Sequence, residues 1–319
     1  MNLSEPQTRR SFAKNTAVLA AATAIMTSSR SEAGAHSAET GKEVTYRFYR
    51  NATAKLTYAG LTLLLDPMLS NKGELPSFAG IEPNPTVELP VATDQIIEGI
   101  DAVIVSHLHE DHFDDAAAAI LDKDIPLITP RNEAPVTISD PSVKISHKQR
   151  LVDYGFTDVR EMDADGNDSI TFEGVTMMQV WALHGRGHVG DLMGGVNGII
   201  LSAPGMPTIY WAGDTIFNAD EFEPILANYK PDVVIAHTGG PLIEALSPEI
   251  LLMDAAEGIE FAKMANRYNP EVQIVAIHME ALDHCFSTRQ DLRLAVDKLD
   301  QSIGERFIIP NDGDLIILS

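Results

Sequence analysis

The feature that most constrains the fold is the segment 106–112, which reads Ser-His-Leu-His-Glu-Asp-His. It follows the apolar residues of Asp101–Ser106, a run typical of a strand that is buried on both faces. A helix is predicted directly after it, over Asp114–Leu121, because two aspartates suit a helix N-terminus. The order strand, loop, helix places several polar side chains at the end of a buried strand, where one loop can turn them to the same side.

Metal binding is the chemistry that these side chains predict. Four of the six positions from 107 to 112 carry residues that ligate metals: His107, His109, Asp111 and His112. Imidazole nitrogen and carboxylate oxygen suit Zn²⁺, Mn²⁺ or Fe²⁺. The alternative is a polar loop with incidental histidines, but polar groups without partners are costly beside an apolar core.

Further ligand-type residues stand alone at the ends of three later apolar runs. They are His184, Asp214 and His278, and each lies where a predicted strand meets a loop. Taken singly, each would more often be a hydrogen-bonded structural residue than a ligand. Together with the cluster at 107–112, they predict one metal site at a rim that several strands share.

The rest of the chain predicts one α/β domain over residues 36–319. Strands come first, and a Gly- and Pro-rich loop is expected over Ser70–Pro90. Later strands alternate with helices, among them one near Asp254–Tyr268 and a last helix opened by a capping box at Ser287–Gln290. Two strands around the turn Asn311–Gly313 end the chain. This order implies sheet packed on sheet, with helices outside.

The cluster and the three later residues resemble the metallo-β-lactamase superfamily. The match is to its H-x-H-x-D-H signature and then its His, Asp and His motifs, in the family's order, over residues 44–319. The nearest branch is that of ascorbate-6-phosphate-lactonase-like enzymes, through Leu65-Asp66-Pro67, Ala212-Gly213-Asp214-Thr215 and His278-Met279-Glu280-Ala281-Leu282. The resemblance implies an α/β fold arranged as a four-layer αββα sandwich and the activity of a metal-dependent hydrolase.

The resemblance also implies a ligand set for two metals. His107, His109 and His184 would hold the first metal, Asp111, His112 and His278 the second, and Asp214 would bridge both. Two Zn²⁺ per chain are expected, with Mn²⁺ or Fe²⁺ as alternatives. Asp66 is expected to orient a ligating imidazole by a hydrogen bond, and His237 to support the site without binding metal.

A hydrolytic mechanism follows from that ligand set. Two metals sharing a hydroxide lower its pKa towards neutrality, and Asp111 can orient it. His188 and His284 are candidates to reach the substrate or to protonate the leaving group, each weighed against a solvated imidazole. Arg186 is a candidate to bind an anionic group, and Cys285 is expected to be a buried thiol and not a nucleophile. The expected substrate is a small-molecule ester, lactone or phosphodiester.

The net charge of the chain reduces the number of functions that fit it. The chain has 23 basic and 46 acidic residues and a net charge of −23, which disfavours binding to nucleic acid. Two other functions stay open: a mono-iron oxidoreductase on the same scaffold, and a non-catalytic periplasmic protein that binds a metal or another ligand. The identity and number of the bound metals would separate them.

Residues 1–35 predict a signal peptide. Thr8–Lys14 carries a twin-arginine pair, an apolar stretch of 12 residues follows, and Ala33-Gly34-Ala35 is an expected cleavage site. The alternative is an uncleaved anchor, but the stretch is much shorter than the roughly 20 residues that span a bilayer. We therefore expect export by the Tat machinery to the periplasm, with no stable membrane association after cleavage.

Overall fold

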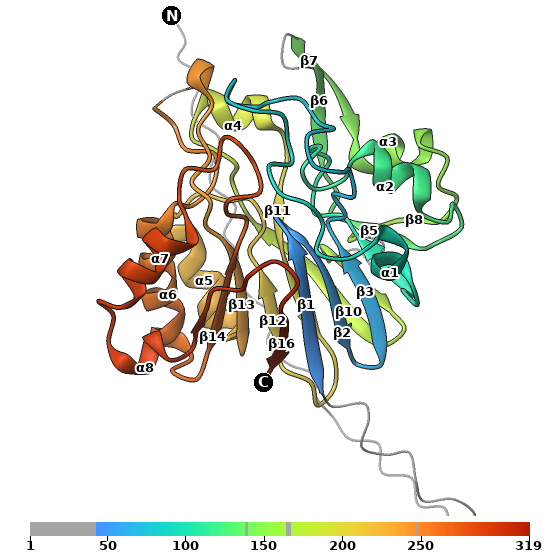
Figure 1. The fold of residues 1–319 in the computed structure, drawn as a ribbon. Coiled ribbons are helices and arrows are strands. Elements are labelled where there is room, and N and C mark those ends of the chain that lie inside the picture. Colours follow the sequence, from blue (N-terminus) through green and yellow to red (C-terminus); the bar gives the residue numbers. More distant parts are fainter. Residues whose placement is uncertain (1–42, 138–139, 164–166, 247) are drawn as a thin grey trace, which may run out of the picture. The chain divides into compact units, whose positions relative to one another are not determined.

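Two seven-stranded sheets lie face to face in the computed structural model (Figure 1). The structure describes residues 43–137, 140–163, 167–246 and 248–319. The first sheet has the order β16 (Leu315–Leu318), β1 (Val44–Arg50), β2 (Thr53–Tyr58), β3 (Leu61–Leu65), β4 (Ala102–Ile104), β5 (Leu127–Thr129) and β8 (Val159–Glu161). Its half from β16 to β3 is antiparallel, and its half from β3 to β8 is parallel.

The second sheet has the same division into two halves. Its order is β15 (Phe307–Ile308), β14 (Gln273–Ile277), β13 (Val233–His237), β12 (Ile209–Trp211), β11 (Asn197–Ser202), β10 (Val175–Trp181) and β9 (Ser169–Phe172). The strands from β15 to β12 are parallel, and those from β12 to β9 are antiparallel. Parallel neighbours need long crossover connections, so the strands that are joined by helices occupy the parallel half of each sheet.

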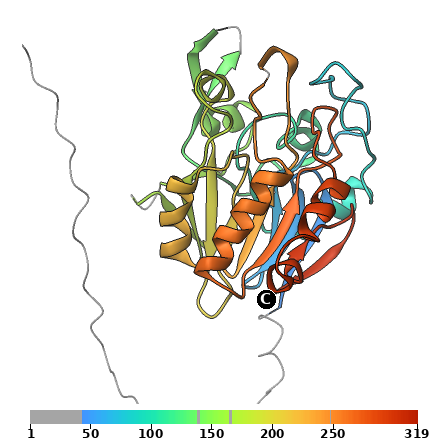
Figure 2. The same cartoon turned by 90° about the vertical axis from the view of Figure 1, so that its left-hand side faces the viewer.

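Helices cover the outer side of each sheet (Figures 1 and 2). The first sheet shares a buried cluster with α1 (Thr93–Ile97), α2 (Asp115–Ile120) and α3 (His147–Asp153). The second sheet shares another with α5 (Ala219–Tyr229), α6 (Ala255–Tyr268) and α7 (Arg289–Val296), and α8 (Gln301–Gly304) contacts α6. This arrangement confirms the predicted four-layer αββα sandwich.

The remaining elements lie at one end of the sheets (Figure 1). They are the hairpin of β6 (Glu133–Thr137) and β7 (Asp140–Ser146), the short helix α4 (His188–Met193), and a 3₁₀ helix at Glu244–Leu246. Helix α4 contacts β6. These elements surround the rim at which the predicted metal ligands lie.

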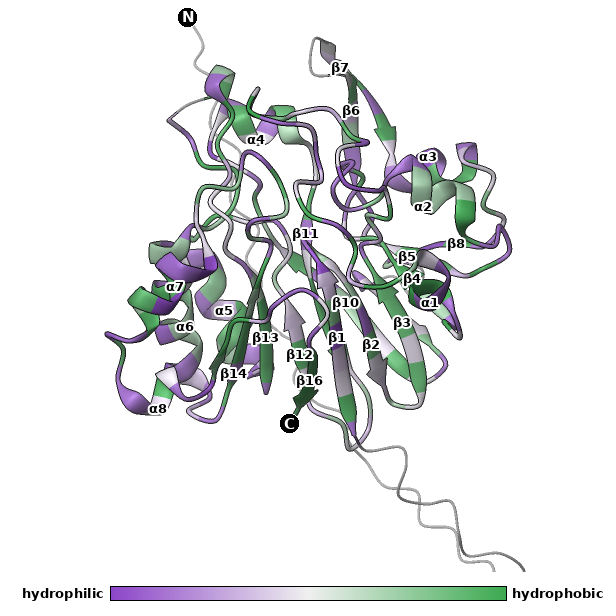
Figure 3. Ribbon diagram, viewed as in Figure 1, coloured by the Kyte–Doolittle hydropathy of each residue, from purple (hydrophilic) through white to green (hydrophobic). Residues whose placement is uncertain are grey.

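Neighbouring residues of the central strands contact different layers. Ile104 and Ile235 lie in the cluster between the two sheets, whereas Val103 and Val234 face the helices. Successive side chains of a strand point to opposite faces, so a strand covered on both sides needs apolar residues throughout. Figure 3 shows the resulting hydrophobic strands between helices with hydrophilic outer surfaces.

One detail of the predicted elements is wrong. The capping box of the last helix begins one residue later, because the Thr288 hydroxyl accepts from Asp291 N–H at 3.1 Å and Asp291 accepts from Thr288 N–H at 3.1 Å. The two predicted terminal strands lie on either side of the turn 311–313, and they belong to different sheets, since β15 pairs with β14 and β16 pairs with β1. The chain thus uses its last turn to cross from one sheet to the other.

The predicted signal peptide lies outside the described residues, so it stays a prediction. Over the ranges described above, no helix combines the length and the apolar character that a membrane crossing requires.

Candidate metal centre

The predicted metal ligands meet where several strands end. The cluster 107–112 follows β4, and Asp66 follows β3, the parallel neighbour of β4. His184, Asp214 and His278 follow β10, β12 and β14 of the second sheet. The site is therefore assembled from both sheets, and it divides into two ligand groups that share Asp214.

The first group, site A, consists of His107, His109 and His184. His109 Nδ1 lies 3.0 Å from His107 Nε2 and 3.2 Å from His184 Nε2. His109 Nε2 lies 3.1 Å from the Met193 carbonyl oxygen, and His184 Nδ1 lies 2.6 Å from the Leu251 carbonyl oxygen. A carbonyl can only accept, so these two nitrogens carry the protons and the nitrogens that face one another carry lone pairs.

Asp66 orients one imidazole of each group. Its Oδ2 accepts from His112 Nδ1–H at 2.7 Å and from the Ser106 hydroxyl at 2.6 Å. The Ser106 hydroxyl has then used its proton, so it accepts from His107 Nδ1–H at 3.1 Å. Both His112 and His107 consequently direct Nε2 into the site, and burial lowers the pKa of His107, so its Nε2 carries a lone pair. This geometry agrees with the supporting role predicted for Asp66.

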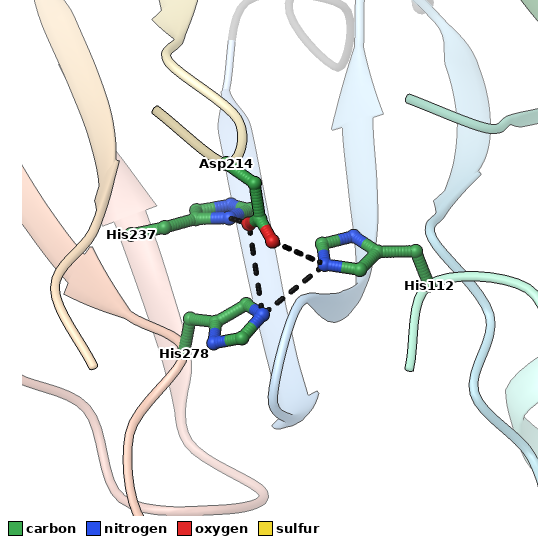
Figure 4. Close-up of side chains that lie close together, drawn as sticks. All are labelled: His112, Asp214, His237 and His278. Carbon is green, nitrogen blue, oxygen red and sulfur yellow. Dashed lines mark hydrogen bonds and ion pairs between the residues drawn. The ribbon is translucent and has the colours of Figure 1, made fainter. Parts of the chain in front are cut away.

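The second group, site B, consists of Asp111, His112 and His278. His278 Nε2 lies 3.1 Å from His112 Nε2 and 3.2 Å from Asp111 Oδ2. Asp111 Oδ2 lies 3.6 Å from His112 Nε2. In Figure 4, His112 enters from the side opposite to Asp214 and His278, and the three side chains point toward one another.

Asp214 lies between the two groups. Its Oδ2 is 3.2 Å from His112 Nε2 in site B, and 3.5 Å from His184 Nε2 and 3.8 Å from His107 Nε2 in site A. One carboxylate oxygen therefore approaches ligands of both groups, as the predicted bridge requires.

His237 is close to site B, but both of its nitrogens are already occupied. Its Nε2 accepts from the Trp211 indole N–H at 2.8 Å, so its Nδ1 carries the proton and donates to Asp214 Oδ1 at 2.6 Å. His237 has no lone pair left for a metal. The geometry agrees with the prediction that it supports the site without ligating.

The donor set fits divalent metal ions. Three lone pairs converge in site A, and such an arrangement is repulsive unless a cation lies between them. Zn–N bonds of about 2.0–2.1 Å in a tetrahedron would separate the nitrogens by about 3.3 Å, close to the spacing found here. Burial lowers the pKa of the three site A histidines, that of His184 to about 4, so these ligands are neutral at pH 7.

The carboxylates are charged at neutral pH. Burial by itself would raise the pKa of Asp111 and of Asp214, but their interactions with His112 and His278, and that of Asp214 with His237, together outweigh burial and lower both pKa values. His112 in turn has a raised pKa, because Asp214, Asp111 and Asp66 outweigh its burial. A cation bound among these groups would replace the positive charge of His112.

Comparison with known proteins identifies the family. The model of the β-lactamase superfamily domain matches residues 61–279. YddR of Bacillus subtilis (strain 168), a UPF0173 protein, is 33% identical over 270 residues, which is 83% of this chain and 96% of that protein. The chain belongs to the metallo-β-lactamase superfamily.

Solved structures of related proteins support the same membership. A protein of Veillonella parvula DSM 2008, described as a possible metal-dependent hydrolase, has a TM-score of 0.73 at 29% identity and covers 86% of this chain and 100% of its own. Isothiocyanate hydrolase from Delia radicum gut bacteria has a TM-score of 0.71 at 31% identity, with coverage of 85% and 98%. Further UPF0173 relatives at 25–29% identity are named metal-dependent hydrolases. This member of the metallo-β-lactamase superfamily is a metal-dependent hydrolase, and its His and Asp groups can hold metal ions.

A cavity of about 310 Å³ opens onto the ligands of this metallo-β-lactamase superfamily hydrolase. Its floor carries His109, Asp111, His184 and Asp214, and most of its wall is apolar. The apolar lining comprises Phe78, Leu108, Ala134, Pro135, Val136, Leu192, Met193, Pro241, Ile243 and Leu251. The metal centre is thus reached through a largely hydrophobic chamber.

The structure separates the two histidines predicted to act on the substrate. His284 lines the cavity and meets the Phe78 ring edge-on, at 5.1 Å between centroids. Its buried Nδ1 has no hydrogen-bond partner among the described residues. His188 is exposed at the first position of α4 and does not line the cavity. Only His284 is therefore placed to meet a substrate in this chamber.

The other predicted polar groups are also placed. Arg186 forms ion pairs with Glu249 at 2.9 Å and Glu257 at 2.7 Å. Its guanidinium is thereby engaged and lies outside the cavity lining. The Cys285 sulfur lies 3.7 Å from His278 Nδ1, and burial raises its pKa well above the usual value. It is a protonated thiol at pH 7, as expected for a residue that is not the nucleophile.

Sequence reasoning missed the turn between β1 and β2. Arg50, Asn51 and Thr53 are fully buried there. The Thr53 hydroxyl donates to the Asp66 carbonyl oxygen at 2.7 Å and accepts from Met68 N–H at 2.9 Å, which holds the residues after β3. The signal in the sequence was this group of polar residues between two strands in which polar and apolar residues alternate. Polar residues in a turn usually indicate only that the turn is exposed to solvent.

Proposed function

We propose that the chain hydrolyses a small uncharged molecule at a dinuclear centre that holds two zinc ions. The observation that carries this proposal is the pair of ligand groups that share Asp214 on the floor of an apolar cavity. Site A would hold one ion and site B the other. A complete donor set for each argues for two metals per chain.

The residues around the cavity have distinct tasks in this proposal. Two divalent metals, when bound, would lower the pKa of water towards neutrality and polarise the bond under attack. Asp111 lines the cavity, and its carboxylate can accept a hydrogen bond from the attacking water. Burial lowers the pKa of His284, so this residue is a neutral imidazole at pH 7 that can hydrogen-bond to the substrate near the leaving group.

The lining favours an uncharged substrate over a phosphodiester. Glu110, Asp111 and Asp214 line the cavity together with the basic Arg150, and Arg186 is paired with two glutamates elsewhere. An ester or lactone with an apolar body would fit the wall, whereas a phosphodiester would place its charge beside apolar side chains and lose hydration. Isothiocyanates are a second candidate, since the relative at 31% identity is named for their hydrolysis.

The test is a panel of hydrolysis assays on zinc-loaded protein, with the metal content measured by plasma mass spectrometry. The panel contains an aryl acetate, a γ-lactone, allyl isothiocyanate and bis(4-nitrophenyl) phosphate. We expect two zinc ions per chain and turnover of an uncharged substrate in preference to the phosphodiester. One zinc per chain, or hydrolysis of the phosphodiester alone, would contradict the proposal.

A matched pair of histidine variants tests the role of His284. His284→Ala should lower kcat by about 100-fold, at the lower end of the effect of a general acid or base. His188→Ala should leave kcat unchanged, because this side chain is exposed and outside the cavity lining. Equal losses of kcat in the two variants would show that His284 has no specific role in the reaction.

Export belongs to the same proposal. The twin-arginine segment supports delivery to the periplasm by the Tat machinery, where the substrate would be met. Cell fractionation of the wild-type chain and of an Arg9→Lys, Arg10→Lys double variant tests it. We expect the wild type in the periplasmic fraction and the double variant inside the cell, and equal distributions would contradict export by this route.

A further inference from the structure

Asn51 connects the two sheets beneath site B. It lies between β1 and β2 of the first sheet, is fully buried, and is absent from the ligand set. Its Nδ2 donates to the Asp111 carbonyl oxygen at 2.9 Å and lies 3.5 Å from Asp111 Oδ2. Its own carbonyl oxygen accepts from His278 N–H at 3.0 Å. One residue therefore contacts a site B ligand from each sheet.

The orientation of the Asn51 amide follows from its partners. Both Asp111 atoms near it, the carbonyl oxygen and the charged carboxylate, can only accept. The NH₂ end of the amide must therefore face Asp111. The Oδ1 end is buried without a partner among the described residues. A buried acceptor without a donor destabilises the folded state, and the hydrogen bond to Asp111 offsets part of that cost.

Backbone conformation ties Asn51 to His278 as well. Both residues have positive φ, 56° for Asn51 and 67° for His278. Residues other than glycine rarely adopt this region, and Asn tolerates it better than most. The hydrogen bond from His278 N–H to the Asn51 carbonyl oxygen holds the ligand's backbone in this conformation. Asn51 is thus suited to the turn and also fixes the start of the loop that follows β14.

We infer that Asn51 is a positioning residue for site B, which sets the Asp111 carboxylate and the His278 imidazole at metal-binding distance from each other. The inference rests on the proposed dinuclear centre. Site A has no contact of this kind, since its imidazoles donate to Met193, Leu251 and Ser106. Loss of the Asn51 amide should therefore weaken one metal site and spare the other.

The test compares Asn51→Gly with Ala59→Gly. Glycine keeps the positive φ and the carbonyl oxygen that accepts from His278, so only the amide is lost. Ala59 has φ 53° in the turn between β2 and β3, so its replacement controls for the added backbone freedom. Zinc affinities are measured by competition with a chelating dye, His278→Ala identifies the site B affinity, and circular dichroism reports folding. Asn51→Ser serves in the same assay if the glycine variant is unstable.

The expected result is a site B affinity weakened by about 10- to 100-fold in Asn51→Gly, the usual loss when a partner of a metal ligand is removed. The site A affinity and the Ala59→Gly variant should match the wild type. In an Asp111→Ala background, Asn51→Gly should cause no further loss, because residues that act through one another are not additive.

Four results would overturn the inference. Equal weakening of both sites would indicate a general structural effect, and additive losses in the double variant would mean that Asn51 does not act through Asp111. If the wild-type chain binds two zinc ions and Asn51→Gly leaves the site B affinity unchanged, the role of Asn51 is refuted and the dinuclear centre is not. A wild-type chain that binds only one zinc would refute the dinuclear centre, and the inference with it.

Discussion

Sites A and B differ in how their ligands are held. In site A, two of the three imidazoles donate to main-chain carbonyls, those of Met193 and Leu251. In site B, the ligands are held mainly by side chains: Asp66 holds His112, and Asn51 holds Asp111. A main-chain partner stays in place when its side chain is replaced, whereas a side-chain partner is lost. The difference predicts that site A tolerates substitutions nearby and that site B responds to them.

The largest effect should come from the one residue that both sites share. Asp214→Ala removes the oxygen that approaches His112 as well as His184. We expect weak zinc binding at both sites and a loss of activity of at least about 100-fold. Removal of a residue that only supports a ligand costs up to about 100-fold, and Asp214 is itself a proposed ligand. Zinc titration and kcat/KM measure the two losses. If only one site weakened, Asp214 would belong to that site and not to both.

An intermediate effect is expected at Asp66, which orients His112 directly and His107 through Ser106. Asp66→Asn keeps the shape of the side chain but removes its charge. The direct hydrogen bond to His112 should therefore weaken more than the indirect contact with His107 through Ser106. We expect the site B affinity to fall by about 10- to 100-fold and the site A affinity to fall less. The exposed Asp297→Asn is the control, since it removes the same charge far from the ligand set. A greater loss at site A would reverse the proposed comparison.

The smallest effect is expected at Met193. Met193→Leu conserves volume approximately and keeps the carbonyl that accepts from His109, so the site A affinity should be unchanged. The same zinc competition assay measures it. A clear loss of site A affinity would show that the side chain, and not the main chain, positions His109.

The local part of the metal centre could be predicted from the sequence. The cluster 107–112 is contiguous, so its spacing reveals the ligands without knowledge of the fold. His184, Asp214 and His278 were weaker signals, because each is a single residue at a strand end. Their role as ligands rested on a resemblance, and the structure brings a side-chain atom of each to 3.2 Å from a residue of the cluster.

Other parts of the molecule could not be predicted in this way. Helix α5 was not predicted, and its interior Pro224 is a residue that usually ends a helix. The turn 311–313 between the two terminal strands is of a type common in hairpins, yet these strands join different sheets. Strand pairing of this kind depends on contacts between residues far apart in the chain. A local pattern carries no information about them.

The sequence by itself determined the chemistry of the ligands, the continuous apolar runs of the buried strands and the order of strands and helices that makes four layers. Those properties are local, because they depend on residue type and on spacing along the chain. The tertiary structure alone decided that Asn51 lies beneath Asp111 and His278, that His284 faces the cavity while His188 does not, and that His237 has no free nitrogen. Each of these depends on which distant segments pack together, and hydrogen-bond partners are chosen by that packing.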